Sequence, residues 1–156
     1  MKRRIVVLSF AVVLLALASC GATGGGRKVR VDYPKERTPG GVVLRDLALG
    51  QGPPSRPGDE LDIHYVARLP DGRKVDSTHE RGVAVTFVLG EAKVEGWNEG
   101  LLGMQKGGER WLRVPAALAY GSEGVPGLVP PDTDLEFEVE LVEIRPDGER
   151  PPEGAE

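Results

Sequence analysis

The stretch of residues 94–104 constrains the fold most, because it is the clearest helix pattern in a chain body made of strand patterns. Within it, Trp97, Leu101 and Met104 recur at i, i+4 and i+7, the spacing of one apolar stripe on a helix. Gly107-Gly108 is predicted to end the helix, since glycine accepts the left-handed conformation found there. A helix this short cannot bury its stripe alone. We therefore expect it to lie against a sheet, with the Trp97 indole at the contact.

Segments with alternating apolar and polar residues surround this helix. Residues 61–69 alternate in this way, which is typical of a half-buried strand. The remaining strands are expected at residues 42–47, 75–76, 83–89, 110–114 and 135–141. The last of these has glutamates between its apolar residues, so we expect an acidic outer face with Arg110 and Arg113 across from it. Antiparallel strands with one helix over the sheet predict an α+β domain from residue 40 to 145.

The amino end has the pattern of a signal peptide. Lys2-Arg3-Arg4 is positive, and residues 5–18 form an apolar run too short to span a bilayer comfortably. The run ends at Leu17-Ala18-Ser19-Cys20, which resembles the lipobox of bacterial lipoproteins. That resemblance implies cleavage after residue 19 and lipidation of Cys20; an uncleaved anchor and a plain secretory signal are the alternatives. The expected location is the bacterial cell envelope, at the outer membrane or periplasmic face rather than in the cytoplasm.

The segments on either side of the predicted domain have different compositions. Residues 20–39 combine three consecutive glycines with charges and prolines, so we expect a flexible tether. Residues 146–156 are proline-rich and acidic, which predicts a disordered tail. Cleavage after residue 19 would remove three positive charges and change the net charge from −4 to −7. Such a chain would repel phosphates, so nucleic acid is not an expected partner.

Side chains suited to metal or covalent chemistry are scarce. The only histidines, His64 and His79, have neither a cysteine pair nor a helical histidine–carboxylate spacing beside them, so no metal site is predicted. The single cysteine is Cys20, which excludes an intramolecular disulfide. The serines do not stand in a nucleophile elbow, and no phosphate-binding glycine loop is present. Metal, covalent and phosphoryl-transfer chemistry are disfavoured, and no cofactor is expected.

Aromatic residues are concentrated in the predicted domain: Tyr65, Phe87, Trp97, Trp111, Tyr120 and Phe137. By alternation, Tyr65, Phe87 and Phe137 point to the sheet face that receives the helix, whereas Trp111 points to the opposite face. Phe87 is predicted to be plain core. Tyr120 begins a loop rich in glycine and proline, residues 119–131, which is either a set of turns or a flap over an apolar cleft. The residue pattern alone leaves these two possibilities open.

A series of motifs, in order and spacing, resembles the FKBP-type peptidyl-prolyl isomerases. The matching segments are Tyr65, Asp71-Gly72-Arg73-Lys74-Val75-Asp76-Ser77, Arg81-Gly82, Phe87-Val88-Leu89-Gly90, Gly96-Trp97-Asn98-Glu99-Gly100, Ala119-Tyr120-Gly121, Pro130-Pro131 and Phe137-Glu138-Val139-Glu140-Leu141. The ensemble covers residues 40–145 and is far more specific than any single motif. It implies a bent, mostly antiparallel sheet wrapped around one short helix, and cis/trans isomerisation of the bond before proline.

The resemblance also implies roles for individual residues. Trp97 would be the floor beneath the proline ring, and the walls would be Tyr65, Val75, Val85 and Phe137. Tyr120 would offer its hydroxyl to a substrate carbonyl, and the backbone N–H of Val94 or Glu95 would offer a second hydrogen bond. Asp76 would be the carboxylate beside the pocket, with Arg81 as its partner. The flap would contribute Val125, Leu128 and Val129.

Two departures from the family pattern bear on activity. Val75 and Val85 stand where the family often has phenylalanine, which implies a wider pocket and a modest isomerase. The alternative is a binding module for proline-containing segments that has lost useful rate, or a chaperone-like lipoprotein. Val125 occupies a flap position that is often histidine. Expected partners are proline-containing polypeptides, FK506- or rapamycin-like macrolides and, through the lipid, a membrane. A monomer is expected, since no long helical dimerisation arm is present.

Overall fold

The computed structural model describes residues 33–147. Seven strands form one sheet: β1 (Glu36–Arg37), β2 (Val43–Ala48), β3 (Glu60–Arg68), β4 (Lys74–Ser77), β5 (Val85–Val88), β6 (Glu109–Val114) and β7 (Leu135–Arg145). The helices are α1 (Thr78–Arg81), α2 (Glu95–Gly100) and the 3-10 turn η1 (Ala116–Leu118). The predicted signal peptide, Cys20 and most of the predicted tail lie outside the described residues.

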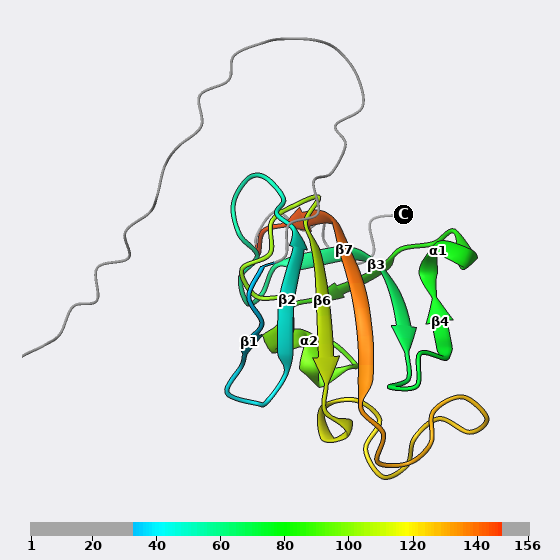
Figure 1. Ribbon diagram of the computed structural model, residues 1–156. Coiled ribbons are helices and arrows are strands. Elements are labelled where there is room, and N and C mark those ends of the chain that lie inside the picture. The colour runs from blue at the N-terminus through cyan, green and yellow to red at the C-terminus, as the bar shows by residue number, and fades with distance from the viewer. Residues whose placement is uncertain (1–32, 148–156) are drawn as a thin grey trace, which may run out of the picture.

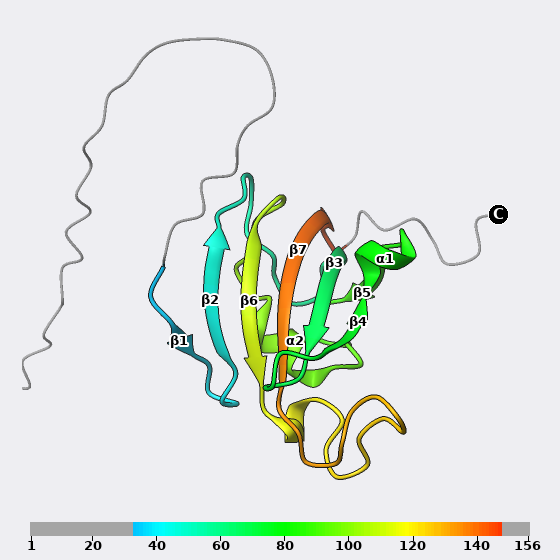
Figure 2. The ribbon, with the colours of Figure 1, turned by 45° about the vertical axis from the view of Figure 1, so that its right-hand side comes forward.

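The sheet is antiparallel throughout, with the order β1-β2-β6-β7-β3-β4 and with β5 paired to β3. Figure 1 shows these strands side by side, with β7 between β6 and β3. Along β7, Phe137 is paired with Ala67 of β3 and with Leu112 of β6. The last strand of the chain therefore joins the two halves of the sheet. Figure 2, turned by 45°, shows the twist that antiparallel strands accumulate.

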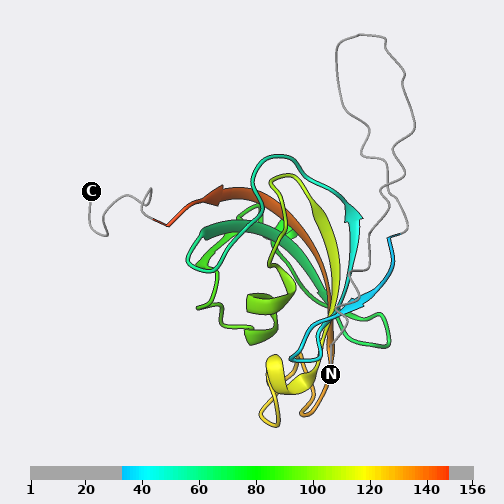
Figure 3. The same cartoon turned by 90° about the vertical axis from the view of Figure 1, so that its left-hand side faces the viewer.

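The sheet bends around α2, which lies on its concave side (Figure 3). Close approach requires glycine, because a Cβ at Gly96 would stand 2.4 Å from Cγ1 of Val114 on β6. The α2 stripe joins the core, with Trp97, Leu101 and Met104 all buried. This confirms the predicted α+β fold with one short helix against a bent, mostly antiparallel sheet.

Buried Arg110 fixes the carboxyl end of α2. Its guanidinium donates to the carbonyl oxygens of Gly100, at 2.8 Å, and Leu102, at 2.9 Å, while its Nε donates to Asp46 at 2.7 Å. The Gly100 carbonyl lies in the last turn of α2 and the Leu102 carbonyl just beyond the helix, where no helical N–H is available to either. The expectation that Arg110 would stand across from the β7 glutamates is therefore wrong: it points to the core face, whereas Arg113 points outward and pairs with Asp134.

Several predicted boundaries also need correction. The helix ends at Gly100 rather than near Gly107-Gly108, and turns through Gly103, with φ of +75°, carry the rest of the stripe. Strand β5 begins at Val85, and Val83 is 66% exposed. Strand β1 lies within residues 20–39, assigned to the tether, so the sheet begins before residue 40. Among residues 33–147, no helix is both long and apolar enough to cross a bilayer.

Candidate active site

Four aromatic rings pack together where α2 meets the sheet. The Trp97 ring centroid is 5.1 Å from that of Tyr65, 5.4 Å from Phe137 and 5.6 Å from Phe87. Tyr65 and Phe137 meet edge to face, at 6.0 Å. Trp97 is 6% exposed, whereas Tyr65 and Phe87 are only partly buried. The aromatic cluster, as we call these four rings, thus extends from the core to the surface, an arrangement favourable for an apolar ring of a ligand.

Phe87 was predicted as plain core, and the structure places it partly buried at the margin of that core. Because its ring packs on Trp97 and is partly exposed, it belongs to the aromatic cluster. Alternation along the strand correctly predicted that Phe87 points to the face that receives the helix, but it could not predict that the ring remains partly exposed there. Val75 and Val85, from the flanking strands β4 and β5, pack as partly buried residues against the same core.

A polar constellation adjoins the aromatic cluster. The Tyr65 hydroxyl donates to Oδ2 of Asp76 at 2.5 Å, and Arg81 forms an ion pair with Oδ1 of Asp76. The backbone N–H of Ser77 donates to the same carboxylate at 2.8 Å. The hydrogen bond from Arg81 lowers the pKa of Asp76 to about 2, with the Tyr65 and Ser77 bonds acting in the same direction against burial. The predicted Asp76–Arg81 partnership is thus present, and Tyr65 completes it.

Helix α1, which the sequence did not predict, places Arg81 in this constellation. It begins directly after β4, and its fully buried Thr78 takes the place of a strand residue opposite Tyr65. Oγ1 of Thr78 accepts from the Tyr65 N–H at 2.8 Å and donates to the Tyr65 carbonyl at 3.2 Å. One turn later the chain reverses at Gly82, with φ of +69°. The signal in the sequence was a four-residue turn, too short to show helical periodicity.

A second residue that sequence reasoning missed is Asn98, which shapes the loop before α2. Its Oδ1 accepts from the backbone N–H of Gly90 at 2.9 Å and of Ala92 at 3.0 Å. The loop thereby delivers Val94, the buried N-cap residue, and Glu95 to the start of α2. The first N–H groups of a helix have no intrahelical acceptor, so this end offers donors beside Trp97.

Residues 119–131, the flap, extend beyond the end of β6 and β7 (Figure 1). Tyr120 is 41% exposed; burial raises the pKa of its hydroxyl, and so does the negative charge of Asp76. Val125 and Val129 exchange backbone hydrogen bonds of 2.8 Å, and both pack against the core. Leu128 is 52% exposed. The structure thus directs Val125 and Val129 inward and leaves Leu128 at the surface.

The flap has its own hollow, of about 470 Å³. Val125, Leu128 and Val129 line it together with flap prolines, and Arg73 and Glu123 supply its charged groups. Neither charged residue was among the predicted site residues. The flap residues therefore form an apolar surface of their own, with one cation and one carboxylate at its border.

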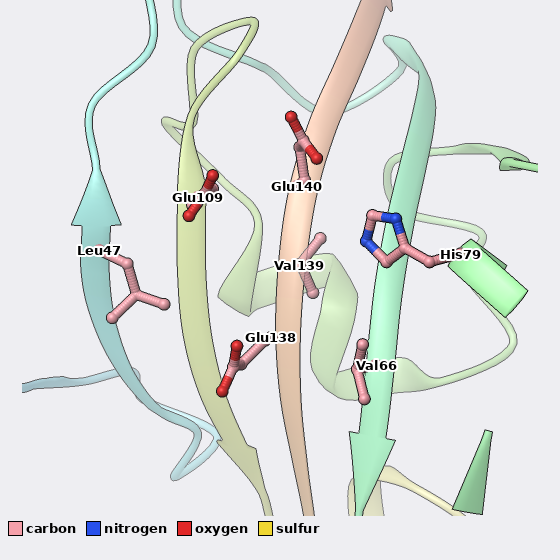
Figure 4. Close-up of a pocket in the computed structure, with 7 residues that line it drawn as sticks. All are labelled: Leu47, Val66, His79, Glu109, Glu138, Val139 and Glu140. Atoms are coloured by element: carbon pink, nitrogen blue, oxygen red, sulfur yellow. The ribbon is translucent and has the colours of Figure 1, made fainter. Parts of the chain in front are cut away.

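Another hollow, of about 220 Å³, lies on the outer face of the sheet (Figure 4). Glu109, Glu138 and Glu140 surround it, with His79 beside them and Leu47 and Val66 at its sides. The aromatic cluster lies on the other face of the same strands, so the two sites are separate. Among residues 33–147, no group of three or more histidine, cysteine or acidic side chains is arranged to hold a metal ion.

The sequence resembles proteins of known family. Residues 52–142 match the family model described as FKBP-type peptidyl-prolyl cis-trans isomerase. An FK506-binding protein of Neisseria meningitidis serogroup B is 41% identical over 106 residues, which cover 67% of this chain and 97% of that protein. A peptidyl-prolyl cis-trans isomerase of Saccharomyces cerevisiae is 45% identical over 91 residues, which cover 57% of this chain and 67% of the yeast protein.

Solved structures agree with these relatives. FkpA from Escherichia coli superposes with a TM-score of 0.66 and 35% identity, covering 72% of this chain. The chain spans only about half, 52%, of that structure. A peptidyl-prolyl cis-trans isomerase from Pseudomonas syringae superposes with a TM-score of 0.64 and 31% identity, covering 72% of this chain and 81% of the other.

Proposed function

The chain belongs to the FKBP-type peptidyl-prolyl cis-trans isomerases, and from this premise we propose that it binds the twisted X-Pro imide in the aromatic cluster. The observation that carries the proposal is the packing of three rings around Trp97 next to the Tyr65–Asp76–Arg81 constellation. In this arrangement Trp97 is the floor under the proline ring, and Val75, Val85 and Phe137 contribute to the walls.

Catalysis by such a site follows from the electronic structure of the amide. Rotation has a barrier of ~18–20 kcal/mol, because it breaks the resonance of the peptide bond. A twisted amide has lost that resonance, so its carbonyl is less dipolar than that of the planar form. Apolar aromatic surroundings therefore disfavour the planar state more than the transition state. Lowering the barrier by ~4 kcal/mol accelerates rotation about a thousandfold.

Polar groups at the edge of the cluster orient the substrate. The Tyr120 hydroxyl donates to a substrate carbonyl, and the N–H of Val94 or Glu95 donates to another. Asp76 is a positioning residue, because its carboxylate already accepts from Tyr65, Ser77 and Arg81. No proton transfer is required, so the mechanism needs no general base.

An exchange assay on an X-Pro peptide tests the proposal. The purified chain from Cys20 onward is expected to accelerate cis/trans exchange, measured by NMR. Trp97→Leu should lower kcat/KM at least tenfold, and Tyr120→Phe severalfold, because each removes a substrate contact. Trp111→Phe is the control, since Trp111 lies on the outer face. An isomerisation rate that depends on Trp111 but not on Trp97 would contradict the proposal, because it would place the site on the outer face of the sheet.

The second candidate function is a binding module that holds proline-containing segments without useful rate, as a weak chaperone-like lipoprotein. The valines at positions 75 and 85 favour it, because they leave thinner walls than phenylalanine would. Line broadening of a proline peptide without acceleration of its exchange would support this candidate. FK506-like macrolides should compete for the same aromatic cluster under either function.

We further propose that the protein is a lipoprotein of the bacterial cell envelope, anchored through Cys20 and acting there as a monomer on proline-containing polypeptides. The support is the sequence of the amino end: a positive start, a short apolar run and Leu17-Ala18-Ser19-Cys20. An acyl anchor would hold the folded domain at a membrane without a spanning helix.

A further inference from the structure

We propose that a basic hollow on the outer face of the sheet docks the domain onto anionic phospholipid headgroups. The basic hollow, of about 380 Å³, lies where β1, β2 and β6 run side by side. Its lining includes Lys35, Arg37, Trp111, Arg113, Pro115 and Asp134. This inference rests on the proposed lipid anchor for its biological setting, but on the described residues for its geometry.

The charges of the basic hollow oppose those of the whole protein. Three cations line it, against the single carboxylate of Asp134, in a chain whose net charge is −4. Arg113 pairs with Asp134 at 3.3 Å in an exposed geometry, and Asp134 also accepts from the Ala116 N–H. Glu136 is paired with Arg113 across the strands but does not line the hollow. Glu138 is likewise paired with Trp111, and with Glu109 and Glu140 it lines the neighbouring hollow on the same face of the sheet. Because salt screens charges over about 8 Å, docking requires the edge of the sheet at β1, with Lys35 and Arg37, to lie nearer the lipid than these glutamates.

The chemistry of the basic hollow matches a lipid headgroup region. Guanidinium and ammonium groups pair with phosphate oxygens. Nζ of Lys35 lies 5.1 Å from the centre of the Trp111 ring, so a cation and an indole occupy the same spot. Tryptophan is favoured at membrane interfaces, where its apolar body and its N–H meet different surroundings. A soluble acidic peptide could pair with the cations, but unlike a lipid bilayer it would offer no apolar region for the outward-facing Trp111 indole.

The position of the basic hollow in the chain suits a docked, anchored domain. Lys35 and Arg37 belong to the first described strand and its approach, and Tyr33 is thirteen residues after Cys20. Thirteen residues span at most about 45 Å when fully extended, so the hollow can reach the bilayer that holds the lipid. Docking would then replace a freely tumbling domain with an oriented one.

That orientation would leave the aromatic cluster accessible. Along β6, Arg110, Leu112 and Val114 are buried toward α2, whereas Trp111 and Arg113 point to the outer face. Figure 3 shows α2 on the concave side and β1 at the edge of the sheet. A domain resting on the β1 edge of its outer face therefore presents Trp97 away from the lipid.

Coupling through the single cysteine tests docking independently of cellular acylation. The chain from Cys20 onward is attached by its thiol to a maleimide phospholipid in vesicles that also contain bromine-labelled lipids. Quenching of Trp111 fluorescence then reports lipid contact, and the Trp111→Phe variant supplies the background from Trp97. Quenching is expected on vesicles containing phosphatidylglycerol, with loss on pure phosphatidylcholine and at high salt.

A charge variant and its matched control make the test decisive. Arg37→Gln/Arg113→Gln should lower the docking constant about 25-fold, since each basic residue near an anionic surface contributes roughly fivefold. Arg56→Gln/Lys106→Gln changes the net charge equally outside the hollow and should leave docking unchanged. The proposal would be overturned if both double variants lost docking equally, or if Trp111 were quenched as strongly on neutral vesicles. It would also be overturned if an acidic peptide, but not anionic lipid, changed the Trp111 fluorescence. Failure of Cys20 acylation in cells would instead bear only on the anchor.

Discussion

At the residue scale, the ionisable side chains of the candidate site keep a fixed protonation state around neutral pH. The pKa of Asp76 is held at about 2, chiefly by the hydrogen bond from Arg81. Burial raises the pKa of both Tyr65 and Tyr120 from the usual value of 10.0, and the nearby Asp76 charge acts in the same direction. Asp76, Tyr65 and Tyr120 thus each remain in one protonation state over the middle of the pH range.

These fixed protonation states predict that the pH profile of kcat/KM is not bell-shaped. Since Asp76 stays ionised and both tyrosines stay neutral, kcat/KM should be flat from about pH 5 to pH 9. Exchange spectroscopy on an uncharged X-Pro peptide across that range checks it. A slope near neutrality would mean that a group outside these three controls the rate.

Asp76 also predicts a pH-dependent stability. Its folded pKa, about 2, lies below the ordinary aspartate value of 3.8, so the stabilisation is complete above about pH 4 and is lost as pH falls toward 2. Asp76→Asn should lower the unfolding free energy at pH 7 by roughly 1 kcal/mol, a discounted value because solvent screens this partly exposed pair. Urea titrations at pH 7 and pH 2.5 should show a smaller gap between variant and wild type at the lower pH. If the difference in unfolding free energy between variant and wild type were the same at both pH values, Asp76 would not be the group whose titration changes the stability.

At the element scale, the contact between α2 and the sheet decides where Trp97 lies. Gly96 faces Val114 and Gly100 faces Leu112 and Val42, so the helix meets β6 through its glycines. A Cβ at Gly100 would stand 3.0 Å from a Leu112 methyl, looser than the 2.4 Å to Val114 at Gly96. The two glycines therefore differ in how much room a methyl group would find.

Gly96→Ala should displace α2 and Trp97 with it. We expect a loss of about 1–3 kcal/mol in unfolding free energy from overpacking, together with a fall in isomerase rate. Gly100→Ala is the matched control: it gains the same helix propensity of about 1 kcal/mol and meets a softer neighbour. Urea unfolding and the exchange assay on both variants check this. Equal effects at the two positions would show that the close approach to Val114 is unimportant.

Local pattern predicted the elements better than their ends. Alternation located β3, β6 and β7 and placed Trp111 on the face opposite the helix, because burial imposes a period of two on a strand. Helical spacing placed Trp97 at the contact with the sheet. The true end of α2 depends on Arg110, a charged residue whose burial no local pattern indicates. Helix α1 and the Asn98 loop likewise depend on side chain–backbone bonds between segments. The family motifs indicated that Tyr65, Trp97 and Phe137 belong together, whereas the Phe87 ring of the cluster was predicted only as core.

At the scale of the whole molecule, the described domain, residues 33–147, has two faces with different chemistry. The aromatic cluster lies on the face of the sheet that packs against α2, and the basic hollow lies on the other face. Figure 3 shows α2 on the concave side of the sheet. This two-sidedness suits an enzyme held at a surface, because substrate access and docking do not compete.

The anchor is tested in cells. Cys20→Ser should abolish incorporation of a labelled fatty acid and release or mis-process the protein, because the thiol is the site of acylation in bacterial lipoproteins. Ser19→Ala, next to it, should retain labelling. Label that survives Cys20→Ser would refute the anchor without affecting the isomerase assignment.

The central place of β7 bears on when the protein can fold. Without this strand the sheet falls into two groups, β1-β2-β6 and β3-β4-β5, with no hydrogen-bonded ladder between them. Because β7 is the last strand of the described sheet in chain order, a chain emerging from the ribosome cannot complete this sheet until all of its other strands have been synthesised. We expect it to remain unfolded during that interval, in the threadable form that the proposed export across a membrane would require.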